Sequence, residues 1–349
     1  EGTHDKYHDE LEYASEAEKW LQMAATESDK LITSGRYEIY NTGHPQEDYF
    51  NMYRIDDKSD LKEAVLYVDY KTNIREHNMA AAGREAGCGF SKSFVESFLC
   101  SDGLPISLSN KYLGDETMRK ETANRDPRLK QLILTNDFPT NVTDDLKDST
   151  FVVNEDEFIT QHCFTGYRPI KGFNPIYSQA LYMKSSFDGI AYRYAETLLI
   201  NAEAKAELNT ITNADLDRTV NQLRDRVGMP HLTVNVGFTD PKWPDWGYSL
   251  SPVLQEIRRE RCIELAGEGF RFNDLKRWKA GKLLNNVLTY VGKRKPDGNL
   301  AIVYPNYTNP DLSYQAGKSR TWEDKMYLYP IPTGELQRNP QLLPQNPGW

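Results

Sequence analysis

The sequence predicts a mainly α-helical protein, in which paired helices form a scaffold with extensive loops and a few short strands. Residues 16–33, 191–228 and 252–266 place apolar side chains at the three- and four-residue spacing of amphipathic helices. Residues 136–190 carry few periodic signals and several glycine and proline residues. Helices separated by long irregular segments are therefore expected.

The first predicted helix covers residues 16–33. Gly35 follows its last apolar residue, where a left-handed residue commonly ends a helix. Residues 36–70 then change to a period-two, aromatic-rich pattern, which predicts short extended segments. The apolar face of the helix is formed by Ala17, Trp20, Leu21, Ala24, Ser28 and Leu31.

A long polar segment, residues 71–91, separates this region from the next expected helix at 92–99. A loop of this length inside a compact domain is usually functional or disordered. Another element is expected to begin at 125–129, and residues 136–190 are interpreted as loops with short strands.

The best-defined helix pair is 191–228, which ends at Gly228 shortly before Pro230. Alanines on its first helix let two helices approach closely, and the unit spans about 34 residues, the tetratricopeptide period. Such a pair needs neighbours to bury its apolar face, and the 16–33 helix is one candidate. The facing stripes are Ala195, Leu198, Leu199, Ala202 and Ala206 on the first helix and Leu216, Val220, Leu223 and Val227 on the second.

After the 252–266 helix, another helix is expected over residues 273–280, and residues 290–326 form a polar, aromatic loop region. The tail from Tyr327 to Trp349 is rich in proline, which excludes a long helix because each proline removes a backbone donor. Its apolar content predicts a segment that lies extended over a core and is pinned there.

Composition limits the classes of function. With 349 residues, 39% of them hydrophobic, the chain has enough apolar residues for a substantial core. Its net charge is −9 and its basic residues are dispersed, which argues against a nucleic-acid partner. No apolar run approaches the length of a membrane span. The 21 tyrosines suit wet interfaces that bind sugars or peptides, and equally an ordinary loop-rich protein.

The sequence offers no metal, cofactor or catalytic motif. Its six histidines are scattered, and it has no HExxH, no G-x-S-x-G elbow, no P-loop and no dinucleotide fingerprint. We therefore predict no cofactor, no metal and no enzymatic activity, although a convergent catalytic triad would leave no such motif. Buried free thiols, rather than a disulfide framework, are expected of Cys88, Cys100, Cys163 and Cys262.

The helix Arg258–Glu268 carries Glu260, Glu264 and Glu268 on one face at four-residue spacing. Paired carboxylates serve glycosidases, whereas helical di-metal sites add a Glu-x-x-His motif, and this helix has no histidine. We favour a partly buried ion network that locks the helix to its neighbours. The basic residues available to it nearby are Arg258, Arg259, Arg261, Arg271 and Arg277.

Collinear motifs along nearly the whole chain resemble those of the SusD/RagB family, the surface nutrient-binding lipoproteins of Bacteroidetes glycan-uptake systems. The motifs that carry the resemblance are Arg125-Asp126-Pro127-Arg128-Leu129, Tyr192-Arg193-Tyr194-Ala195-Glu196, Arg258-Arg259-Glu260-Arg261, Asp274-Leu275-Lys276-Arg277-Trp278 and Asn339-Pro340-Gln341-Leu342. One departure is Ala266-Gly267-Glu268-Gly269, where the family commonly has phenylalanine before Glu-Gly.

The resemblance implies a tetratricopeptide-like fold and a non-catalytic, cell-surface protein that binds an oligosaccharide or polysaccharide. It further implies delivery of that glycan to a SusC-like TonB-dependent transporter at the extracellular face of the outer membrane. Attachment would be through an N-terminal lipid anchor that is not present in this chain. A peptide-binding member of the family and a generic helical-repeat protein-interaction module remain as alternatives.

The resemblance also implies an N-terminally incomplete domain spanning residues 1–349. Its expected parts are the end of a helical repeat at 1–40, a loop-rich ligand-facing region at 41–190, the tetratricopeptide-like helix pair at 191–228 and a C-terminal region at 229–349.

Two aromatic stretches are candidate ligand sites. In the first, within Tyr67–Phe90, planar side chains would stack on sugar faces while amide, guanidinium and imidazole groups bond to hydroxyls. The second leads directly into the charged helix, and tryptophans between prolines are often packing plugs, so the first is favoured. The first comprises Tyr70, Asn73, Arg75, His77 and Asn78, and the second Trp243, Trp246 and Tyr248.

Overall fold

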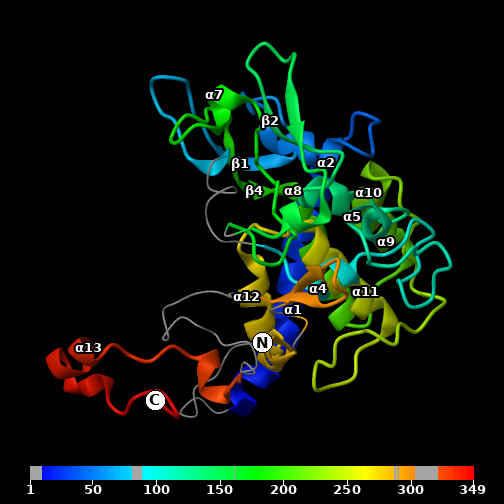
Figure 1. Ribbon diagram of the computed structural model, residues 1–349. Coiled ribbons are helices and arrows are strands. Elements are labelled where there is room, and N and C mark those ends of the chain that lie inside the picture. Colours follow the sequence, from blue (N-terminus) through cyan, green and yellow to red (C-terminus); the bar gives the residue numbers. More distant parts are fainter. Residues whose placement is uncertain (1–9, 81–88, 161, 287, 289–290, 303–320) are drawn as a thin grey trace.

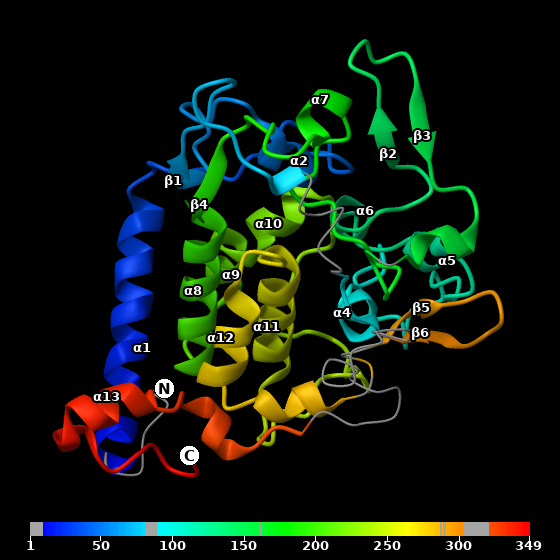
Figure 2. The ribbon, with the colours of Figure 1, turned by 60° about the vertical axis from the view of Figure 1, so that its left-hand side comes forward.

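The protein has a tetratricopeptide-like helical fold with a few short strands (Figure 1). Its core layer contains α1 (Glu10–Thr33), α8 (Tyr194–Glu207) and α11 (Pro252–Glu264), which lie side by side in Figure 2. The computed structural model describes residues 10–80, 89–160, 162–286, 288, 291–302 and 321–349.

Helix α1 packs along α8, and α8 packs against α11. Buried Asn201 on α8 ties the first two helices together, because its amide donates to the Ala25 carbonyl oxygen and to Ser28 Oγ, each at 3.0 Å. Ala195 and Ala202 of α8 are fully buried, as expected of small residues that let helices approach closely. Gly35 has a φ of +63°, which confirms the left-handed ending predicted for the first helix.

The second half of the predicted helix pair is interrupted. The sequence predicts one helix, whereas the structure has α9 (Asn213–Arg218) and α10 (Val220–Arg226) on either side of Thr219. Thr219 leaves helical geometry, with φ −127° and ψ −97°, and its hydroxyl donates to the Asp215 carbonyl oxygen at 2.6 Å. Local side-chain bonding of this kind competes with the helix, and the hydrophobic spacing does not reveal it.

The remaining helices surround this layer. Helix α12 (Phe270–Arg277) begins three residues before the predicted one, and α4 (Lys92–Ser97) lies where a short helix was expected. Other short helices lie in segments interpreted as loops or extended chain. These are α2 (Asp48–Asn51), α5 (Met118–Thr122), α6 (Arg128–Leu132), α7 (Tyr177–Ala180) and α13 (Thr333–Arg338), with 3₁₀ turns η1 (Met52–Arg54), η2 (Glu155–Phe158), η3 (Gly281–Asn285), η5 (Asp324–Tyr327) and η6 (Pro340–Leu342).

Short strands form three antiparallel two-stranded ribbons in the described residues. The ribbon of β1 and β4 lies at the end of the helical layer opposite α13 (Figures 1 and 2). In its register, Leu66 faces Tyr192 and Tyr67 faces Ile190. The pairs are β1 (Ala64–Val68) with β4 (Gly189–Arg193), β2 (Pro139–Val142) with β3 (Ser149–Phe151), and β5 (Val291–Arg294) with β6 (Leu300–Ile302).

The C-terminal tail corrects one expectation. Its beginning contacts the helical part of the protein: Tyr327 accepts the Gly281 N–H at 2.9 Å, and Lys276 lies 4.1 Å from the Tyr329 ring centre. Beyond this point the tail folds on itself, forms α13 and has no buried residue. Trp349 Nε1 donates to the carbonyl oxygens of Lys325 and Leu328, so the tail's own backbone takes the place of the predicted core contact.

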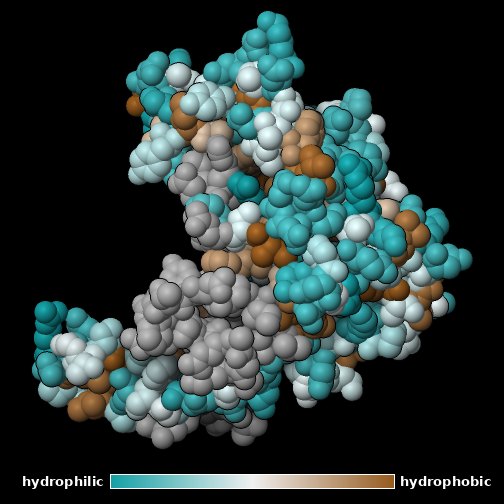
Figure 3. All heavy atoms as spheres, viewed as in Figure 1, coloured by the Kyte–Doolittle hydropathy of each residue, from teal (hydrophilic) through white to brown (hydrophobic). Residues whose placement is uncertain are grey.

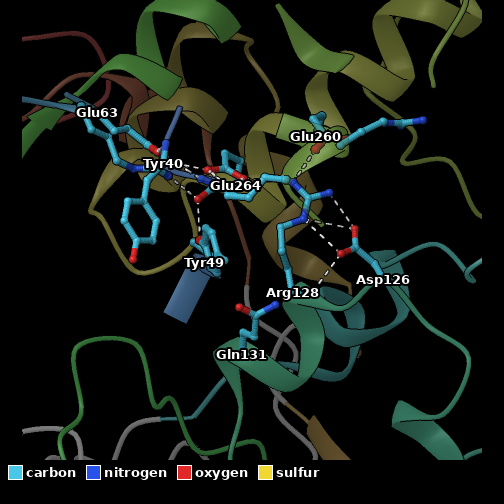
Figure 4. A network of polar contacts seen from close by, with 12 residues as sticks. Tyr40, Tyr49, Glu63, Asp126, Arg128, Gln131, Glu260 and Glu264 are labelled. Carbon is cyan, nitrogen blue, oxygen red and sulfur yellow. Dashed lines mark hydrogen bonds and ion pairs between the residues drawn. The ribbon is translucent and has the colours of Figure 1, made fainter. Parts of the chain in front are cut away.

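A buried ion network joins the segments around Glu264, the last residue of α11 (Figure 4). Its carboxylate is fully buried and contacts Arg128 on α6, Arg193 at the end of β4 and Arg226 at the end of α10, at 3.0, 2.6 and 2.6 Å. Glu63, just before β1, accepts from two of the same guanidinium groups. The network therefore connects two helical segments and one ribbon to α11.

The charges in this network are balanced by close opposite charges. Burial alone would raise the pKa of Glu264, but the guanidinium groups of Arg226, Arg193 and Arg128 outweigh burial and hold it well below 4.5. Glu260 pairs with Arg128 and Arg224, and Glu268 pairs with Arg193 and Lys171. The structural interpretation of the glutamate-rich helix is thus supported, although its main partners come from distant segments.

Replacing Glu264 by Gln tests this network. The loss of one anion leaves three buried guanidinium groups undercompensated, so the free energy of unfolding should fall by about 3–5 kcal/mol. The matched control is Glu27→Gln on α1, an exposed residue paired with Lys30, for which a change below about 0.5 kcal/mol is expected. Urea denaturation of both variants measures the difference, and equal effects would contradict a network that holds the fold together.

Candidate functional site

The favoured candidate residues lie in the Tyr70–Met79 segment, beside the β1–β4 ribbon. Backbone bonds run in both directions between His77 and Ser185, at 2.9 and 3.1 Å. Asn78 Oδ1 accepts the Met183 N–H at 3.0 Å, and Lys184 pairs with Glu76. The segment is therefore fixed along residues 183–187, which lead into β4.

Asp188 anchors the start of this segment. Its buried carboxylate accepts the N–H groups of Tyr70 at 2.7 Å and Lys58 at 2.9 Å. The Lys58 ammonium donates to the Asp188 carbonyl oxygen at 2.5 Å, and burial lowers the pKa of Lys58 to about 8. One residue before β4 thus connects three stretches of chain.

His77 has a different role from the one predicted. Its Nδ1 accepts the Met79 N–H at 3.1 Å, so Nε2 carries the proton and donates to the Phe187 carbonyl oxygen at 2.9 Å. Its ring also meets the rings of Tyr70 and Phe187 edge to face. Both nitrogens are occupied within the protein, which leaves no imidazole nitrogen to bond a ligand hydroxyl.

The other four predicted residues lie close by in the same segment. Arg75 lies over the Tyr70 ring at 5.0 Å from its centre. Asn73 adopts a φ of +63° in the turn between the paired residues 71 and 75, a conformation that asparagine tolerates. Asn78 uses its Oδ1 for Met183, and its amide nitrogen makes no hydrogen bond to the described residues.

The sequence analysis did not identify the exposed tyrosines that lie beside the Tyr70–Met79 segment. Tyr177 and Tyr182 lie in residues 177–185, which run along the Tyr70–Met79 segment, and their side chains are 52% and 73% exposed. Met79, Met183 and Ile74 are also exposed. Hydrophobic and hydrophilic residues alternate over this end of the molecule in Figure 3. Two tyrosines five residues apart were the only signal available, and residues 136–190 were interpreted as loops with short strands.

The second candidate stretch does not form an open aromatic face. Trp246 is buried against Trp278 and beneath the Arg258 guanidinium, and its Nε1 donates to Gln255. Trp243 donates to Glu256 at 2.7 Å, and the Tyr248 hydroxyl donates to the Trp278 carbonyl oxygen at 2.7 Å. These contacts fit packing plugs.

The glutamates of α11 and its exit do not form a glycosidase pair. Glu260 and Glu264 are buried, and both bind the Arg128 guanidinium (Figure 4). The pKa of Glu268 is about 2, because Arg193 and Lys171 overcome the effect of burial, so this group does not hold a proton for general acid catalysis. Within the described residues, no group of three His, Cys, Asp or Glu side chains is placed to hold a metal ion.

The thiols fit the sequence expectation in part. Cys100 and Cys163 are buried as expected, whereas Cys262 is only partly buried. Cys88 lies outside the described residues, as do residues 81–88 of the predicted 71–91 loop.

His77 should make stability depend on pH. Burial and the nearby Lys58 charge lower its pKa below 6.5, against the opposing effect of the Phe187 carbonyl. As pH falls below about 6.5, the unfolded chain binds a proton at His77 more readily than the folded protein does. The contribution of neutral His77 to stability is therefore fully present above that pH and is lost as pH falls toward the lowered pKa of the folded state. Protonation also replaces the Nδ1 acceptor of Met79 N–H by a donor.

His77→Asn supplies a neutral acceptor and should remove this pH-dependent term. Urea denaturation at pH 7.5 and pH 5.0 should show a larger loss of stability in the wild type than in the variant. Because all other groups titrate in both proteins, the difference between the two pH responses reports His77 alone. Parallel responses would contradict the bonding described for its ring.

Comparisons with known proteins agree with this architecture. A SusD-like protein of Bacteroides fragilis shares 24% identity and a TM-score of 0.66 over 97% of this chain and 64% of its own. A SusD-like carbohydrate binding protein of the same species shares 23% identity and a TM-score of 0.65 over 93% of this chain and 62% of its own. SusD-like protein P2 of Formosa agariphila is 33% identical over 166 residues, which are 48% of this chain and 27% of that protein.

The chain thus spans less than two thirds of the length of these relatives. No helix among the described residues has the length and apolar character needed to cross a bilayer. The sequence profile of the SusD family matches residues 30–349, and the chain therefore belongs to the SusD family.

Proposed function

We propose that this protein is a non-catalytic, cell-surface glycan-binding protein that delivers oligosaccharide to a SusC-like TonB-dependent transporter in the outer membrane. Family membership supports this role, and one similar solved structure is described as a carbohydrate binding protein. Within this chain, the supporting observation is the exposed aromatic surface formed by Tyr177 and Tyr182 beside the Tyr70–Met79 segment.

The chemistry of this surface suits sugars. A tyrosine ring offers an apolar face to the C–H groups of a pyranose, while its hydroxyl and neighbouring amides bond to sugar hydroxyls. Asn73 and Arg75 are exposed in the neighbouring Tyr70–Met79 segment. Because Asp188, His77 and Asn78 fix the backbone, the surface is formed before ligand arrives, which reduces the entropy lost on binding.

The glutamates that the sequence offered for glycosidase chemistry are not part of this surface. The carboxylates with strong ion pairs lie in the buried network, whereas Glu76 at the candidate surface pairs with Lys184 at 3.0 Å. Capture and release of an unchanged glycan is therefore the function that this arrangement supports. Shallow exposed contacts also permit the rapid release that delivery to a transporter requires.

Tyr182→Ala tests the aromatic surface. Loss of one stacked ring should weaken binding to the best ligand of a glycan array by about 2- to 10-fold, on the basis of roughly 0.5–1.5 kcal/mol per aromatic contact. Tyr177→Ala should act in the same direction. Isothermal titration with the array-selected oligosaccharide measures both.

Tyr329→Ala is the matched control, since this tyrosine is 68% exposed but lies on the tail, beside Lys276 of α12. Its affinity should equal that of the wild type. An array with no binder, together with binding to a peptide mixture, would favour a peptide-binding member of the family. Release of shorter sugars from the bound glycan would overturn the non-catalytic proposal.

A further inference from the structure

Two basic side chains face each other at the tip of the Tyr70–Met79 segment. Lys71 and Arg75 exchange both backbone bonds, at 2.8 and 2.9 Å, and form an antiparallel bridge closed by a three-residue turn. Side chains of such a directly bonded pair project from the same side, with Cβ atoms about 5 Å apart. The two basic side chains therefore leave the backbone on the same side of the bridge.

This arrangement is unfavourable by itself, because like charges directly opposite each other destabilise an antiparallel pair. No carboxylate of the described residues lies within ion-pair distance of Lys71 or Arg75, and exposed Asp69 pairs with neither. The net charge of the chain is −9, so acidic partners are abundant elsewhere in the sequence.

Apart from exposed Asp69, the other charged groups around the pair are already occupied. Glu76 is neutralised by Lys184, and the Asp188 carboxylate is buried on two backbone N–H groups. The Lys58 ammonium is bonded to backbone carbonyl oxygens. The Arg75 guanidinium is further held over the Tyr70 ring, which orients it while its N–H groups stay exposed. Lys71 and Arg75 thus carry two unpaired positive charges against the one unpaired carboxylate of Asp69, so the net charge at this end of the segment is positive.

We propose that Lys71 and Arg75 bind an anionic group on the ligand, a carboxylate or sulfate carried by a sugar ring, so that the glycan is an acidic one. This inference rests on the proposed function. A guanidinium binds a planar carboxylate or a sulfate through two parallel hydrogen bonds, and the adjacent ammonium adds a second charge. The rings of Tyr182 and Tyr177 would stack on the sugar-ring faces of the same glycan.

The test uses an oligosaccharide array with neutral, uronate-containing and sulfated members of equal length, probed with wild type, Arg75→Gln and Lys71→Gln. The tightest wild-type ligands should be acidic, with affinity that falls as sodium chloride rises from 50 to 500 mM. Arg75→Gln should weaken these ligands by about 10-fold or more, and Arg75→Lys should recover only part of the loss because it lacks the paired donors.

Lys282→Gln is the matched control. Lys282 is an exposed lysine on η3 that forms no ion pair with the described residues, and its replacement should leave every affinity unchanged. Lys71 and Arg75 are exposed, so their variants should melt at or slightly above the wild-type temperature. That measurement separates a lost contact from a lost fold.

The outcomes are distinguishable. Tightest binding to neutral glycans, or acidic glycans bound equally by wild type and Arg75→Gln, would overturn the acidic-ligand inference and leave glycan binding intact. Binding of poly-glutamate peptide but of no glycan, lost in Arg75→Gln, would show that the carboxylates come from protein and would overturn both proposals.

Discussion

The structure depends on the burial of Glu264 among three guanidinium groups. A chain with this much irregular structure needs a device that fixes loops to helices, and apolar contact alone is not directional. Glu264 closes α11 and binds Arg128, Arg193 and Arg226, each from a different segment. Removal of any one partner leaves charge uncompensated in a dry environment, so the segments are held as a unit. Arg193 is also the residue of the network that connects it, along the chain, to the candidate site.

That connection is short. Arg193 ends β4, and residues 187 and 188 just before β4 hold His77 and Tyr70 of the candidate segment. The position of an exposed loop is thus set by the strand that the ion network fixes. This explains how an exposed loop can hold its conformation before any ligand binds. It also places the pH-sensitive imidazole between the rigid ribbon and the exposed tip.

The sequence predicted what is local and missed what is distant. Helical spacing located α1, α8, α11 and α12, because the periodicity of an amphipathic helix can be recognised within a single segment of the sequence. It did not predict the break at Thr219, where a hydroxyl competes with the helix, or the tail that bonds to its own backbone. The partners of Glu264 were missed as well, since they lie 38 to 136 residues away in the chain.

The candidate site shows the same division. Composition indicated Tyr70, Asn73, Arg75, His77 and Asn78, and the structure places them in one segment. It could not show that both His77 nitrogens are used internally, because the acceptor of one is a carbonyl 110 residues away. Tyr177 and Tyr182 join the surface only through strand-like pairing of residues 77 and 185. A candidate surface built from two segments can be recognised only once the pairing of their backbones is known. The charge of that surface then depends on which of its charged side chains find no partner of opposite charge.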